Sequence, residues 1–251
     1  MSRSKDSSQI KRVGEGSCDI TLGGQSLSLL PERGVYWAER RVLFVADLHL
    51  GKDATFRQAG LAVPAMSSRD SLSRLQRLIE AYEPLECIIL GDLIHAADSL
   101  NERVHTEIGE FFLRVPKCKW RLIKGNHDRH TKKWPEHWPL VIEVEGGYEA
   151  PFRLLHIPPI AEETDGDLNQ ARSRQTSNLI AKADEYFLAG HIHPSWRVKG
   201  SVLVREKLDC FWLTSRGLVL PAFGTFTGTK VIDRSSRDRI FVLADSQVIE
   251  V

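Results

Sequence analysis

The sequence predicts one α/β domain in which two packed sheets carry helices on their outer sides. In the first half of the chain, apolar strand-like runs alternate with amphipathic helical stripes, a pattern typical of βαβ units. After Trp134 the runs are mostly strand-like with little helical periodicity, which favours a second, more antiparallel sheet. A chain of 251 residues is long enough to bury such a core.

The elements of the first half follow in order. Residues 1–18 are rich in Ser, Lys, Arg and Gly and predict a disordered tail, so the folded domain is expected to span 19–251. Alternating polarity around "GG" in 19–30 indicates a hairpin. Apolar spacing predicts a helix over 67–82, with Ser67 or Ser68 as its N-cap, and another over 100–112. The strands expected between these elements are "GVYW", "RVLFVAD", "ECIILGD" and "KWRLI".

The second half is expected to form the second sheet. Its strand-like runs are "LVIEVEG", "FRLLH", "YFLAGHIH", "SVLVRE", "FWLTSRGLVLPAF" and "RIFVLAD". A polar stretch at about 160–178 is unlike core sequence and is interpreted as an insertion.

Composition excludes several classes of protein. The formal net charge of +1 gives no global nucleic-acid signature, so any phosphate-binding surface must be local. The four cysteines are scattered, without a CxxC pair, and are interpreted as reduced thiols of a cytoplasmic protein. The sequence shows neither a signal peptide nor a membrane-spanning run, and no membrane partner is expected.

Coordinating side chains follow several of the predicted strands. In sheets of βα units, ligands gather at the carboxyl ends of strands, so these side chains can converge. Carboxylate, amide and imidazole ligands without thiolate suit Mn, Fe or Zn, and they exceed what one cation needs. The residues are Asp47 and His49 in "VADLH", Asp92 in "LGDLIH", Asn126 and His127 in "GNHD", His156 in "LLH", and His191 and His193 in "AGHIH".

The pairs spaced by two residues leave two geometries open. In an extended strand, residues i and i+2 share a face, so His191 and His193 could chelate one cation. A bent backbone at the strand end could instead divide them between two cations. Each piece alone also has an ordinary explanation, because "GD" is common in turns and "HxH" occurs in surface histidines.

In combination, D-x-H, G-D, G-N-H-D, H and G-H-x-H resemble the signature of the calcineurin-like metallophosphoesterases. The resemblance implies a four-layer αββα sandwich, in which two mixed sheets are flanked by helices. It assigns one divalent cation to Asp47, His49, Asp92 and His193, and a second to Asp92, Asn126, His156 and His191. Manganese is expected first, with Fe, Zn or Mg as alternatives. Asp92 would be shared, with the cations about 3.5–4 Å apart.

The same resemblance implies hydrolysis of a phosphate ester. Two cations would lower the pKa of a bound water and neutralise charge on the phosphoryl oxygens. His127 would be the catalytic acid that protonates the leaving group, and Asp128 would orient or charge its imidazole.

A narrower resemblance concerns the substrate. The runs "ADLHLGKDATFRQAGLAVP", "GNHDR", "AGHIHPSW" and "LPAFGTFTG" resemble the bacterial ligase-associated DNA damage response endonucleases. This implies a phosphodiester substrate, DNA in the first instance, and a functional association with a DNA ligase or helicase. Lys52, Arg57 and Arg129 flank the ligand motifs and could bind phosphate oxygens, or they are solvated loop charges.

Two rival readings remain at this point. The same metal centre serves small-molecule phosphatases and nucleotide phosphodiesterases. Inactive relatives, such as the retromer scaffold subunit, use the fold for binding, but they have lost ligand positions that are all present here. The sequence does not predict an oligomeric state.

Overall fold

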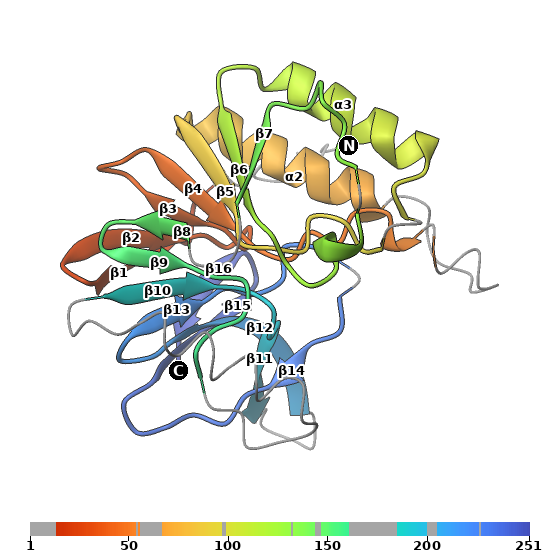
Figure 1. Cartoon of the computed structure of the whole chain (residues 1–251). Helices are drawn as coiled ribbons and strands as arrows, with labels where there is room; N and C mark the ends of the chain where they lie inside the picture. The colour runs from red at the N-terminus through yellow and green to blue at the C-terminus, as the bar shows by residue number, and fades with distance from the viewer. Residues whose placement is uncertain are drawn as a thin grey trace, which may run out of the picture.

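Two mixed sheets lie face to face at the centre of the molecule, with two helices over one of them (Figure 1). The computed structural model describes residues 14–53, 55, 67–96, 99–131, 133–143, 147–160, 185–199, 205–225 and 227–251. The α/β class with two mixed sheets, predicted from the sequence, is confirmed. None of the helices in the described ranges is long and apolar enough to cross a membrane.

The first sheet combines an antiparallel and a parallel half. Its strand order follows the sequence, and β4 to β7 run parallel to one another. The predicted hairpin around Gly23 and Gly24 is confirmed, with Leu22 opposite Gln25. The strands are β1 (Cys18–Leu22), β2 (Gln25–Leu29), β3 (Val35–Trp37), β4 (Val42–Val45), β5 (Glu86–Ile89), β6 (Lys119–Ile123) and β7 (Leu140–Glu143).

The second sheet has the order β14-β11-β12-β13-β10-β9-β8, and β15 pairs with β12 and β16. Its centre is parallel, because β10 runs parallel to both β9 and β13. The strands are β8 (Gly147–Glu149), β9 (Phe152–Leu154), β10 (Tyr186–Ala189), β11 (Pro194–Lys199), β12 (Arg205–Leu213), β13 (Gly217–Val219), β14 (Lys230–Val231), β15 (Arg239–Ala244) and β16 (Gln247–Glu250).

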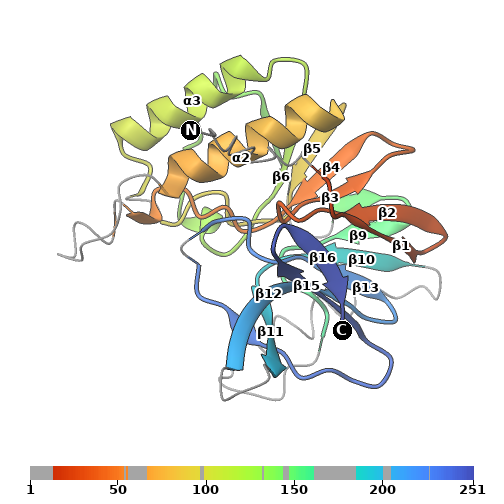
Figure 2. The ribbon, with the colours of Figure 1, turned by 180° about the vertical axis from the view of Figure 1, so that it is seen from behind.

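Helices α2 (Ser67–Tyr82) and α3 (Glu102–Arg114) cover the outer face of the first sheet (Figures 1 and 2). Buried Leu75 and Leu78 of α2 pack there with Ile108 of α3, and each such side chain contributes about 1.5–3 kcal/mol by its burial. A second cluster fills the space between the sheets, and a third lies on the outer face of the second sheet. No described helix covers that outer face.

The structure differs from several of the predicted element positions. The run "LVIE" forms β7 in the first sheet and not in the second, because its backbone pairs in parallel with β6, with Ile142 opposite Leu122. Ser67 and Ser68 both lie within α2, and Ser68 Oγ accepts a hydrogen bond from the backbone N–H of Gly51. β1 begins at Cys18, the last residue assigned to the tail.

Residues 1–13 of the predicted tail, and the predicted insertion apart from Ile160, lie outside the described residues. All four cysteines are free thiols, as predicted.

Candidate metal centre

The predicted ligands meet at one edge of the two sheets. Asp47, Asp92 and Asn126 follow the parallel strands β4, β5 and β6, while His156 and His191 follow the parallel strands β9 and β10. Because parallel strands present their carboxyl ends at the same edge, five segments that are distant in sequence lie together. Side chains at this junction are deeply buried, with Asp47 at 0 % and Asp92 at 2 % exposure.

Many ligand residues have a left-handed backbone. The φ angles are 54° at Asp47, 47° at His49, 51° at Asp92, 71° at His191 and 50° at His193. This conformation costs a non-glycine residue about 1–3 kcal/mol, and such strain gathers at functional sites. The i and i+2 pairs are therefore not in extended strands, and the bent alternative describes them.

The bend divides the ligands into two groups. Within each group, the potential ligand atoms lie within 4.8 Å of one another. One group is Asp47, His49 and His193, and the other is Asp92, His156 and His191.

Asn126 and Asp92 complete this arrangement. Asn126 Oδ1 lies 2.8 Å from His156 Nε2, so the amide oxygen adjoins the second group. Asp92 Oδ2 lies 3.4 Å from His156 Nε2 and 3.7 Å from His49 Nε2. One carboxylate oxygen therefore faces both groups, as expected of a shared ligand.

The two carboxylates each use one oxygen to brace the neighbouring loop. Asp47 Oδ2 accepts a hydrogen bond of 2.8 Å from the backbone N–H of His191, and Asp92 Oδ1 accepts one of 2.9 Å from that of His127. Their other oxygens remain directed at the imidazoles. Gly190 leaves room for this arrangement, since a Cβ there would lie 2.5 Å from Asp47 Oδ2.

Outer hydrogen bonds fix which imidazole nitrogen faces the centre. His156 Nδ1 donates to the carbonyl of Leu90 at 3.1 Å, and His193 Nδ1 donates to that of Gly228 at 2.8 Å. The Nε2 atoms of both rings therefore face the carboxylates, at 3.4 Å from Asp92 Oδ2 for His156 and 3.6 Å from Asp47 Oδ1 for His193. Such outer contacts are a regular feature of metal-bound histidines.

The donor set fits divalent cations. Asp47 Oδ1 is buried and has no hydrogen-bond partner among the described residues. The His49 and His193 Nε2 atoms face each other at 3.4 Å, and His191 Nδ1 lies 3.1 Å from His156 Nε2. Buried acceptors and lone pairs in such proximity are costly unless a cation or proton lies between them.

The pKa shifts of the candidate ligands also indicate a site that attracts cations. Burial disfavours the imidazolium form of His156, yet the hydrogen bond and charge of Asp92 raise its pKa to about 9. Burial would raise the pKa of Asp47, but His193 and His156 hold it below its ordinary value. Burial lowers the pKa of His49 to about 3. The carboxylates therefore attract positive charge into the site.

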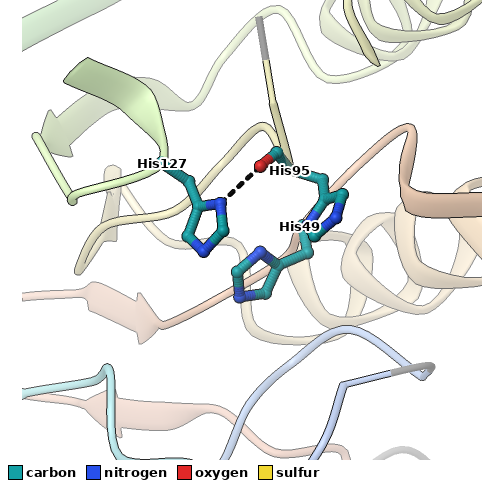
Figure 3. Close-up of side chains that lie close together, drawn as sticks. All are labelled: His49, His95 and His127. Atoms are coloured by element: carbon teal, nitrogen blue, oxygen red, sulfur yellow. Dashed lines mark hydrogen bonds between the residues drawn. The ribbon is translucent and has the colours of Figure 1, made fainter. Parts of the chain in front are cut away.

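His127 lies at the mouth of the centre, and its side chain is 36 % exposed. Its Nδ1 donates to the backbone carbonyl of His95 at 2.5 Å (Figure 3). Its Nε2 lies 4.0 Å from Asp92 Oδ2. The His95 ring stacks on the His127 ring, with centroids 5.2 Å apart. His49 lies beside both rings, and the three histidines form a further cluster of potential ligand atoms.

His95 is a site residue that sequence reasoning missed. The signal was present, since His95 is the histidine of the "GDLIH" run, three residues after Asp92. Burial lowers its pKa to about 4, so its imidazole is neutral at physiological pH.

Asp128 has a different task from the predicted one. Its Oδ1 accepts from the backbone N–H of Ile94 at 3.1 Å and its Oδ2 from that of Gly125 at 3.0 Å. The carboxylate thus ties the loop that carries Asp92 to the loop that carries Asn126. The His127 imidazole donates to the His95 carbonyl, whereas the hydrogen bonds of the Asp128 carboxylate run to backbone N–H groups.

The other candidate residues are less closely involved. Lys52 lines a small recess together with His49 and Thr227, and burial lowers its pKa. Arg129 is exposed in the short 3-10 helix η2 (Asp128–His130), and Arg57 lies outside the described residues. Trp138 is part of the core cluster under the helices and therefore has a packing role.

Residues 222–225 and 227–228 support the centre. The N–H of Gly224 donates to the carbonyl of Asp47 at 3.0 Å. Arg74 of α2, largely buried, donates to the Phe223 carbonyl and lies over the Phe223 ring, 4.4 Å from its centroid. Together with the Gly228 carbonyl, these contacts fix this segment against Asp47 and His193.

Comparisons relate this chain to known phosphoesterases. Residues 40–211 match the family described as calcineurin-like phosphoesterase. The crystal structure of the Pseudomonas putida nuclease MPE is 30 % identical, with a TM-score of 0.73, and the match covers 93 % of this chain and 100 % of that one. The phosphoesterase YfcE from E. coli is 14 % identical, with a TM-score of 0.36 and coverage of 84 % and 97 %. A comparison with curated proteins gives no match.

The family match extends over more than half of the chain, and the P. putida nuclease is matched over its whole length. The prediction of the superfamily is confirmed, and the similarity to a nuclease is consistent with the predicted resemblance to the ligase-associated endonucleases. This chain belongs to the calcineurin-like phosphoesterases and is a metal-dependent phosphoesterase.

Proposed function

We propose that this protein hydrolyses phosphodiester bonds in DNA with two divalent cations, manganese in the first instance. The observation that carries the proposal is the pair of ligand groups that share Asp92, with His127 at their mouth. The likeness to a nuclease over 93 % of the chain supports DNA as the substrate class.

The two ligand groups support the assignment of the cations that the resemblance implies. One would be held by Asp47, His49, Asp92 and His193, and the other by Asp92, Asn126, His156 and His191. When bound, the cations would supply Lewis-acid activation of a water and neutralise charge on the phosphoryl oxygens.

His127 supplies the proton in this proposal. Its Nδ1–H is engaged by the His95 carbonyl, so a proton on Nε2 is directed at the open side of the centre. A phosphodiester there would have its leaving oxygen within reach of that proton, which favours expulsion of the alcohol. Stacking on His95 limits rotation of the ring.

The test replaces His127 with Ala and measures turnover of DNA, a generic phosphodiester and a phosphomonoester, together with metal content. Turnover of DNA is expected to fall about 100-fold or more, the usual contribution of a general acid, while metal content stays near wild type. Loss of metal, with specific activity per bound metal unchanged, would contradict this division of roles. Strong monoesterase activity without diester cleavage would favour a small-molecule phosphatase instead.

A role in DNA repair, an association with a ligase or helicase, and a cytoplasmic location remain predictions from the sequence. The free thiol state of all four cysteines is consistent with a reducing compartment.

A further inference from the structure

The hairpin of β11 and β12 has a basic face that the proposed hydrolysis does not use. Its register places Arg197 directly opposite Lys207, so these two basic positions share one face. The side chains of Arg197 and Lys207 are exposed. Because the whole chain carries a formal net charge of only +1, this face is a local concentration of positive charge.

The opposite face of the hairpin accounts for its packing. Trp196, Val198 and Leu208 lie against the core cluster on the outer side of the second sheet. Folding therefore does not require the basic residues. Like charges directly opposite each other destabilise an antiparallel pair, so the basic face lowers stability in the absence of an anion.

No carboxylate of the described residues neutralises the positive charge of this face. Asp209 shares the face, since it lies opposite Ser195, but it forms an ion pair of 2.5 Å with Arg33. Across the described part of the chain, no ion pair involves Arg197 or Lys207. The basic face is thus open to an external polyanion.

The basic face is continuous with the metal centre. Lys207 Nζ donates to the carbonyl of Thr229 at 2.5 Å, and the carbonyl of the preceding residue, Gly228, accepts from ligand His193. The backbone N–H of Lys230 donates to the His193 carbonyl at 3.0 Å. Strands β11, β12 and β14 lie side by side, and β11 begins directly after His193 (Figure 1).

We propose that Arg197 and Lys207, with Lys230 at the end near the metal centre, bind the backbone of single-stranded DNA beside the cleavage position. This inference rests on the proposed function. Arg197 is four residues beyond His193, or about 13 Å along a strand. That distance corresponds to about four stacked nucleotides.

A single strand suits this geometry better than a duplex. The proposed ligands are recessed, with His156 at 1 % and Asp47 at 0 % exposure, so the scissile phosphate must enter the junction between the sheets. A flexible strand can bend inward there while the basic face holds the adjoining phosphates.

The test measures binding of a phosphorothioate 12-mer by fluorescence anisotropy across a salt series, with Mn present. In the Arg197→Gln/Lys207→Gln variant, two lost contacts should weaken binding about 25-fold at 0.1 M salt and reduce the salt slope by about 1.4. The Arg197→Lys/Lys207→Arg variant should restore most of the affinity. The matched control is Arg77→Gln/Lys117→Gln, which removes the same charge from exposed positions elsewhere and should bind like wild type.

Several outcomes would overturn the inference. These are unchanged binding, an equal loss in the control variant, a loss confined to single-stranded RNA, or self-association of the neutralised variant with unaltered DNA affinity. The last would mean that the charges only protect a sheet edge.

Hydrolysis of bis(4-nitrophenyl) phosphate separates this inference from the proposed function. A wild-type protein that cleaves this diester but does not bind the 12-mer would refute the surface alone. A protein that binds the 12-mer through this face but cleaves no diester would refute the proposed function alone.

Discussion

Replacement of Asp128 by Asn tests the contact that joins the two central ligand loops. The change is nearly isosteric, but the new NH₂ group would face one of two N–H donors, from Ile94 or Gly125. A buried, charge-assisted hydrogen bond contributes about 1.5–3 kcal/mol, and one of the two is lost. For a protein of this size, that loss corresponds to a fall in Tm of about 3–12 °C.

The same variant should also bind Mn more weakly, since one of the two hydrogen bonds that connect the loops of Asp92 and Asn126 is lost. Thermal unfolding without metal, followed by calorimetric Mn titration, measures both effects. Asp233→Asn, at an exposed position, is the matched control and should change neither. Wild-type Tm and Mn affinity combined with reduced turnover would refute this reasoning, and would restore the imidazole-orienting role predicted from the sequence.

Four further predictions follow from the site. His95→Ala keeps the backbone carbonyl but removes a ring contact of about 0.5–1.5 kcal/mol, so turnover should fall about two- to twelvefold at constant metal content; unchanged turnover would contradict a role for the stack. Arg74→Met should lower Mn affinity, measured by calorimetry, because the segment that braces Asp47 loses its anchor, whereas exposed Arg77→Met should not. Chelation should lower Tm, since metal present at 100 times its Kd stabilises the fold by about 2.7 kcal/mol; an unchanged Tm would mean that no metal is bound. Because His156 has a pKa of about 9 without metal, Mn binding below that pH should release its proton and strengthen about tenfold per pH unit, which titrations in buffers of different ionisation enthalpy can detect.

The candidate ligands could be identified from the sequence, and brought to one edge of the fold, because their chemistry is local. Each coordinating residue ends an apolar run, and the position of a strand end follows from hydrophobic pattern alone. Asp47, Asp92 and His156 could therefore be placed at one edge before any coordinates were known.

Backbone conformation at those ends could not be predicted in the same way. Period-2 spacing allowed His191 and His193 to share one cation, but the φ angles of 71° and 50° turn them into different groups. Left-handed residues leave no mark in a polarity pattern, because tertiary contacts such as the His191 N–H to Asp47 bond hold them.

Contacts between segments that are distant in sequence could not be predicted either. The contribution of His95 depends on its carbonyl and on the stacking of its ring, neither of which follows from its spacing to Asp92. Arg74 looked like a polar position beside the apolar stripe of α2, yet it is largely buried over Phe223. Such placements follow only from the packed structure.

Anomalous diffraction at the manganese edge, from crystals grown with Mn, tests the central claim most directly. We expect two peaks about 3.5–4 Å apart, one against Asp47, His49 and His193 and the other against Asn126, His156 and His191, with Asp92 contacting both. A single peak, or peaks away from Asp92, would contradict the account.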